Sequence, residues 1–177
     1  MGITLEDIRP PIWRRVLVSG DISLTRLHDV IQRAMGWENY HLHAFQAGEA
    51  TYGVPDPDFD ELGIRNEKGV RLSRIAPQVK SWFRYEYDFG DDWLHRIAVE
   101  KILPAEESPK HPVCVAGKQA CPPEDCGGPG GYADLLEAIT DPHHEEHAAM
   151  LDWVGGAFDP EAFDLEVVNT ELSKVRL

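Results

Sequence analysis

The sequence lacks the features that mark exported and membrane-spanning proteins. Among its 177 residues there are only three cysteines, an odd number in a chain long enough to fold without disulfide bonds. No run of about 18 apolar residues occurs, and the N-terminus has no charged segment followed by an apolar run. We therefore expect a soluble, cytoplasmic protein without a membrane partner.

Positive charge is also scarce. The 17 lysines and arginines are outnumbered by 31 aspartates and glutamates, which gives a formal net charge of −14. Such a surface repels phosphate backbones, so the charge argues against nucleic-acid binding, although a small basic patch is compatible with it. Aromatic and basic residues adjoin in Trp13-Arg14-Arg15, where alternation is typical of a strand. Whether Arg14 and Arg15 pack internally or bind an anion stays open.

Hydrophobic periodicity predicts one α+β domain over residues 1–177. A strand over 12–18 precedes a helix that ends at Gly36, and a second strand follows over about 41–47. A hairpin over 81–100 comes next, and the C-terminal third has the apolar spacing of helices. The order β-α-β, hairpin and helices favours a mostly antiparallel sheet packed against helices.

The predicted hairpin carries many carboxylates. One of its faces is expected to form a buried layer of Phe83, Tyr85, Tyr87, Phe89, Trp93, His95, Ile97 and Val99. The opposite face and the turn carry Glu86, Asp88, Asp91 and Asp92. Such oxygen ligands suit Mg²⁺ or Ca²⁺, as in a two-metal nuclease. We favour the alternative that these acids keep the outer face hydrated around an ordinary turn.

Histidines form a second possible metal site. His41 and His43 are two residues apart on a predicted strand, so they point to one face, and His95 lies on the apolar face of the hairpin. If the strands pair suitably, three imidazoles can bind Zn²⁺ or Fe²⁺. The alternative, which we favour, is that these histidines lie in the core and are hydrogen-bonded to backbone or carboxylate groups.

The three cysteines lie close to a histidine in the sequence. His111, Cys114, Cys121 and Cys126 supply the imidazole and thiolates of a structural zinc site. Their spacing, H-x2-C-x6-C-x4-C, contains no C-x2-C pair, so a proline- and glycine-braced loop with reduced thiols is the favoured interpretation. If these four residues bind a cofactor instead, the cofactor that they predict is zinc.

Two further patterns are less specific. The segment Cys126–Tyr132 opens a helix with free backbone N–H groups that suit an anion, but it lacks the lysine and hydroxyl residue of a P-loop. Asp141 and Pro142 predict the start of another helix, on which His143 and His147 are one turn apart. Because no H-E-x-x-H order occurs, an exposed helix start is favoured.

Five segments occur together in one order: PPIWRRVLV, AMGWENYHLHAF, YEYDFGDDWLHRIAVEKIL, ACPPEDCGGPGGY and FDPEAFDLEVVN. From about Arg9 to Glu171 the chain resembles the plasmid pRiA4b ORF-3-like family. The resemblance implies a compact α+β domain found in bacteria and archaea and sometimes labelled transposon-resolvase-like. No activity is established for the family, so no catalytic residue carries over. A serine recombinase needs a serine among several arginines, whereas the serines here are scattered.

The favoured function is a non-enzymatic cytoplasmic domain that binds a protein or a peptide, because no segment combines a nucleophile, a base and oxyanion donors. The main alternative is a metal-dependent hydrolase or nuclease that uses either the three histidines or the acidic hairpin. A third possibility, an accessory factor in DNA mobility, is suggested by the family label alone.

Overall fold

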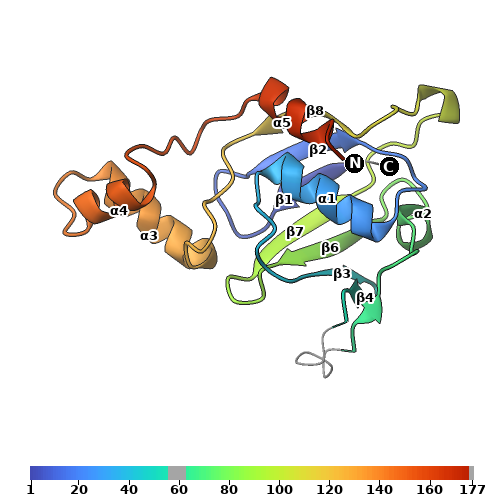
Figure 1. Cartoon of the computed structure of the whole chain (residues 1–177), viewed down its shortest axis with the longest axis horizontal. Helices are drawn as coiled ribbons and strands as arrows, with labels where there is room; N and C mark the ends of the chain where they lie inside the picture. The colour runs from blue at the N-terminus through green and yellow to red at the C-terminus, as the bar shows by residue number, and fades with distance from the viewer. Residues whose placement is uncertain (56–62, 176–177) are drawn as a thin grey trace.

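The computed structural model describes residues 1–55 and 63–175, and most of the predicted loop over 54–63 lies outside them. Eight strands form one sheet in the order β5-β4-β3-β6-β7-β1-β2-β8 (Figure 1). They are β1 (Gly2–Leu5), β2 (Trp13–Leu17), β3 (His43–Ala47), β4 (Ala50–Gly53), β5 (Arg65–Asn66), β6 (Trp82–Tyr87), β7 (Trp93–Ala98) and β8 (Val113–Lys118). All neighbours pair antiparallel except β4 and β5. The predicted α+β fold with a mostly antiparallel sheet is confirmed.

Helices cover one face of the sheet and extend beyond one end of it. They are α1 (Leu24–Met35), α2 (Leu72–Ile75), α3 (Gly128–Thr140), α4 (His147–Trp153) and α5 (Leu165–Leu172). The helix α1 lies on the sheet beside α5, whereas α3 and α4 project past the end of the sheet (Figure 1). No helix of the described residues is long and apolar enough to cross a membrane.

The local sequence explains the bounds of α1. The Ser23 side chain accepts a hydrogen bond from the Arg26 backbone N–H at the start, and Gly36 ends the helix with a φ of 112°. Its apolar stripe packs on the buried layer of β6 and β7, in which Phe83, Tyr85 and Trp93 are fully buried. The predicted buried face of the hairpin is therefore confirmed along both strands.

Sequence periodicity missed four strands. β1 has four residues, too few for a periodic pattern, yet it lies in the middle of the sheet between β7 and β2. β8 contains Cys114 and was interpreted only as part of a cysteine-bearing loop, although it pairs with β2 along Trp13 to Leu17. β4 and β5 are also short, with four and two residues.

One predicted helix start agrees with the structure and one does not. The helix α3 begins at Gly128, inside the segment Cys126–Tyr132 that is predicted to open a helix; Gly127 adopts a φ of 89° and a proline follows in the first turn. The helix α4 begins at His147, and the predicted start at Asp141 is wrong. Asp141 instead caps a separate turn, in which its carboxylate accepts the backbone N–H of His143.

The neighbours Arg14 and Arg15 occupy opposite faces of β2. Arg14 is buried, and its guanidinium donates to the carbonyl oxygens of Ala34 at 2.9 Å and Lys118 at 2.9 Å, which joins α1 to the strand β8. Arg15 is exposed and pairs with Glu100 at 2.6 Å. The question left open by the sequence is answered for Arg14: it is a structural residue.

Replacing Arg14 with alanine is expected to lower the free energy of unfolding by about 3 kcal/mol, because buried carbonyl groups lose their donors. Urea unfolding followed by circular dichroism measures the change. The matched control is Arg15→Ala, which removes an exposed pair and should leave the unfolding midpoint nearly unchanged. Equal effects of the two substitutions would contradict the assigned faces.

Candidate functional site

A chain of hydrogen bonds runs through the core between α1 and the sheet. The His28 ring stacks on His43 with centroids 3.6 Å apart, and its Nε2 donates to Asn39 Oδ1 at 2.8 Å. Because that amide oxygen only accepts, Nδ1 of a neutral His28 is the acceptor of the Tyr85 hydroxyl at 2.7 Å. Burial, aided by the nearby His43, lowers the pKa of His28 to about 4. His43 Nε2 contacts the Glu67 carboxylate at 2.9 Å.

His95 uses both ring nitrogens within the core. Its Nδ1 lies 2.9 Å from the Trp93 carbonyl oxygen and donates to it, which leaves Nε2 to accept the Trp37 indole N–H at 3.2 Å. Burial lowers the pKa of His95 to about 4. Both ring nitrogens are therefore engaged, and neither offers a free lone pair to a metal.

The predicted group of His41, His43 and His95 is not brought together. β3 begins only at His43, so His41 lies before the strand and the two-residue alternation does not apply to it. His43 faces Glu67, His95 faces Trp37, and His41 faces other carboxylates. The favoured interpretation as core histidines fits His95.

The four hairpin acids do not form one cluster, and the expectation that all of them face solvent is wrong for Asp88. This residue follows the end of β6 with a φ of 57°, which breaks the alternation, and it is only 8% exposed. Glu86 stays on the outer face, half-buried, and burial together with the nearby Asp92 raises its pKa. Asp91 accepts the backbone N–H of Gly127, and Asp92 is exposed.

Asp88 instead faces His41 and the loop before α3. His41 Nε2 lies 2.9 Å from Asp125 Oδ1, 3.5 Å from Asp88 Oδ2 and 3.9 Å from Glu124 Oε2. Among the described residues, His41, Asp88 and Asp125 are the one group of three such donors whose atoms all lie within 4.8 Å of one another. This arrangement combines a histidine and an acid from separate predicted groups with an aspartate that sequence reasoning did not single out.

The cysteines have no zinc geometry. No three of His111, Cys114, Cys121 and Cys126, all of which are described, lie within that range. All three thiols are free. Burial raises the pKa of Cys126 to about 12 and that of Cys121 well above its usual value. Burial therefore favours the protonated thiol over the thiolate at both positions.

The glycine-rich segment is shaped by close backbone packing. A side chain at Gly128 would lie 2.3 Å from the Asp91 carbonyl oxygen, and one at Gly131 would lie 1.9 Å from that of Cys126. The Gly127 N–H already donates to Asp91 at 3.1 Å, so a carboxylate of the chain occupies one donor of the predicted anion site. His143 lies outside α4, so the predicted one-turn spacing with His147 does not occur.

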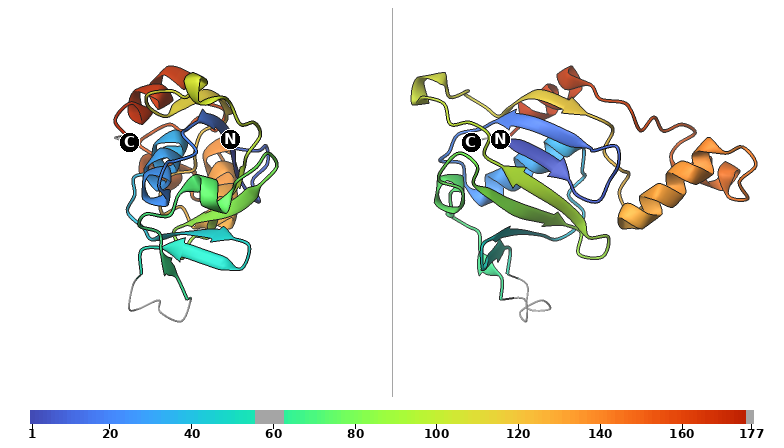
Figure 2. Two further views of the ribbon diagram at one scale, coloured as in Figure 1. Left: turned by 90° about the vertical axis from the view of Figure 1, so that its right-hand side faces the viewer. Right: turned by 180° about the vertical axis from the view of Figure 1, so that it is seen from behind.

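The face of the sheet that points away from α1 has no helix of the described residues over it when the molecule is seen from behind, and we call it the uncovered sheet face (Figure 2). Strand pairing aligns one row of outer residues across six strands: Gln46, Arg84, Arg96, Thr4, Trp13 and Lys118. Arg96 lies 4.5 Å from the ring of Trp82, which is 49% exposed, and Arg84 pairs with Glu6 at 3.0 Å.

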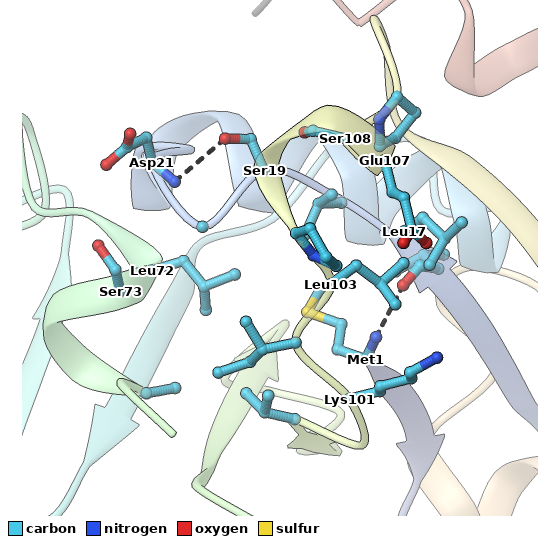
Figure 3. A pocket seen from close by; sticks show the side chains of 18 of the residues that line it. Met1, Leu17, Ser19, Asp21, Leu72, Ser73, Lys101, Leu103, Glu107 and Ser108 are labelled. Carbon is cyan, nitrogen blue, oxygen red and sulfur yellow. Dashed lines mark hydrogen bonds between the residues drawn. The ribbon is translucent and has the colours of Figure 1, made fainter. Parts of the chain in front are cut away.

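A cavity of about 410 Å³ opens between the sheet, α2 and the segment after β7. Apolar side chains such as Met1, Leu72 and Leu103 line it, and Lys101 and Glu107 supply charge (Figure 3). The Met1 ammonium donates to a backbone carbonyl oxygen at 2.8 Å, and so is already engaged. The cavity holds no group of metal-ligating side chains, and it suits an apolar group better than a reacting one.

The comparisons with known proteins agree with this fold. A family model described as plasmid pRiA4b ORF-3-like protein matches residues 1–167. The uncharacterized protein y4hQ of Sinorhizobium fredii is 39% identical over 170 residues, which cover 96% of this chain and 87% of that protein. The crystal structure of a protein of unknown function, MM3350 from Methanosarcina mazei Go1, superposes with a TM-score of 0.83 at 37% identity and covers 93% of both chains.

Stability is expected to fall as the pH decreases from about 6.5 to about 4. His28 and His95 stay neutral in the folded chain because their pKa is about 4, whereas the unfolded chain takes up protons from about pH 6.5. Each histidine contributes a slope of up to about 1.4 kcal/mol per pH unit in this window. Urea unfolding at a series of pH values measures it.

Replacing His28 with glutamine should remove its share of this slope, and His111→Gln, at an exposed position, should not. The same pH dependence in both variants and in the unsubstituted protein would show that His28 does not contribute to it.

Proposed function

The chain belongs to the plasmid pRiA4b ORF-3-like family, and from this premise we propose that it is a non-enzymatic cytoplasmic domain whose uncovered sheet face binds an acidic segment of a partner protein. The single observation that carries the proposal is the transverse row in which Arg84 and Arg96 lie directly opposite each other, with Trp82 beside them.

This pair of arginines is not expected from stability alone. Like charges directly opposite on neighbouring strands destabilise a sheet. The chain also has far fewer bases than acids, with a net charge of −14, yet the row contains Arg84, Arg96 and Lys118. A row with three bases complements acidic side chains of a partner.

The aromatic residues support a protein interface. Tryptophan and arginine are the residue types most enriched among those that dominate binding energy. Trp82 is about half exposed beneath Arg96, and Trp13 lies 5.4 Å from Arg15 in the next row. The Trp82–Arg96 pair offers a flat apolar surface with a guanidinium that can donate to a carboxylate, whereas Arg15 is already paired with Glu100.

The charge pattern favours a protein over a nucleic acid. Glu6 pairs with Arg84, and Glu100 pairs with Arg15, so acids alternate with bases on this face. A continuous phosphate backbone would meet these carboxylates along its path. An acidic peptide segment can place single side chains beside Arg96 and Lys118.

The non-enzymatic part of the proposal is supported by histidines that are already hydrogen-bonded, and the cytoplasmic part by free thiols. His28 and His95 are held neutral in the core with both ring nitrogens hydrogen-bonded, which removes two candidate bases. The three free thiols suit a reducing compartment. The proposal treats the whole chain as one domain.

Replacing Trp82 with alanine is expected to weaken partner binding about 30-fold or more, the effect of losing about 2 kcal/mol at a dominant interface residue. The matched control is Trp153→Ala on α4, because Trp153 is also 49% exposed but lies away from this face. The partner is first captured in cells of the source organism with a photo-crosslinking residue at position 82, and its affinity is then measured by calorimetry.

Charge reversal tests the sign of the partner. Arg96→Glu is expected to abolish the crosslink, whereas Arg26→Glu, at an exposed arginine of α1, should leave it unchanged. A crosslink to nucleic acid, a protein crosslink that survives Arg96→Glu, or a calorimetric affinity that is unchanged in Trp82→Ala would overturn the proposal.

A further inference from the structure

We propose that His41, Asp88 and Asp125 bind a divalent transition-metal ion, with Zn²⁺ as the ion that best suits their donors. The three residues come from the segment before β3, the hairpin turn and the loop before α3. This site lies outside the uncovered sheet face and is independent of the proposed partner binding.

The separations match those between ligands of one ion. Bonds of about 2.0–2.1 Å in a tetrahedral zinc site place neighbouring donor atoms about 3.3 Å apart. His41 Nε2 lies 2.9 Å from Asp125 Oδ1 and 3.5 Å from Asp88 Oδ2. An imidazole with two carboxylates is a mixed N/O donor set, which Zn²⁺ accepts and which leaves room for water.

His41 points an unsatisfied atom into this group. Its Nε2 is shielded from solvent and has no hydrogen-bond partner, although three carboxylates lie within 4 Å. A buried polar atom without a partner costs about 1–3 kcal/mol. A cation between the ring and the carboxylates would satisfy this nitrogen directly.

Asp88 is also placed as a ligand. It is only 8% exposed, and its Oδ1 accepts the Gly90 backbone N–H at 2.9 Å. Its Oδ2 faces His41 at a distance too long for a hydrogen bond. One oxygen thus fixes the carboxylate while the other is directed at the ring, as is usual for a metal ligand held by neighbouring groups.

Hydrogen bonds from neighbouring residues fix the loop that carries Glu124 and Asp125 beside His41. Glu124 lies beside His41 and accepts hydrogen bonds from the Tyr87 hydroxyl at 3.0 Å and the Glu38 backbone N–H at 2.6 Å. The loop that carries Asp125 is tied to the hairpin through the Gly127 N–H and Asp91. The donors therefore come from segments that are already fixed to one another.

The experiment uses the full chain after treatment with a chelator. Calorimetric titration with ZnCl₂ is expected to show one ion per chain, and titration with CoCl₂ should give weak visible bands without the intense near-ultraviolet band of thiolate ligands. Asp125→Asn should weaken binding at least 10-fold; this side chain is 65% exposed, so its replacement leaves the fold intact.

Asp88→Asn and His41→Gln should act in the same direction, and His147→Gln is the control at a histidine outside the site. Binding that is unchanged in Asp125→Asn, or a strong thiolate band with Co²⁺, would overturn the assignment. If no ion binds at micromolar concentrations, His41 forms an ion pair with Asp125 only, and the proposal fails. Crosslinking at position 82 tests the partner surface and metal titration tests the His41 site, so failure of one proposal does not imply failure of the other.

Discussion

The alternation of side chains along β6 and β7 is the constraint on which the rest of the structure depends. Inner residues of this central hairpin, among them Phe83, Tyr85 and Trp93, form the layer on which α1 packs. The same two-residue period places Arg84 and Arg96 on the outer face, directly opposite each other. A shift of one residue in register would exchange the two sets, so the core and the exposed arginines are fixed by one feature.

Several polar side chains of the core are held by hydrogen bonds to one another or to the backbone. Tyr85 accepts the Gln32 amide and donates to His28, and His95 is held between Trp37 and the Trp93 carbonyl group. Burial keeps both histidines neutral, and these bonds orient the aromatic layer. His41, at the edge of the core, differs because its buried nitrogen faces carboxylates without a hydrogen bond.

Much of the fold was predictable because its periodic segments are long. The buried stripe of α1, the two faces of the hairpin and the mostly antiparallel sheet all follow from apolar spacing. β1 was not predictable, because four residues carry no period and its place depends on pairing with β7 and β2. The position of Asp88 was also missed, because a left-handed backbone conformation after β6 turns its side chain inward.

The candidate site was predictable only in fragments. His41 and Asp88 each belonged to a separate predicted metal group, and Asp125 belonged to none. Their meeting depends on contacts between the hairpin turn and the loop before α3, which no local pattern encodes. Trp82 and Arg96 carried a usable signal, since each lies on the polar face of an alternating strand beside charged neighbours.

Oxidative labelling of tryptophan, read by mass spectrometry, tests the central claim that the hairpin's outer face is a binding surface. Trp82 and Trp153 are equally exposed, at 49% each, so both should be labelled to the same extent in the purified protein. In cells of the source organism, Trp82 should be protected while Trp153 stays labelled. Equal labelling of the two residues in cells as well would contradict a partner on this face.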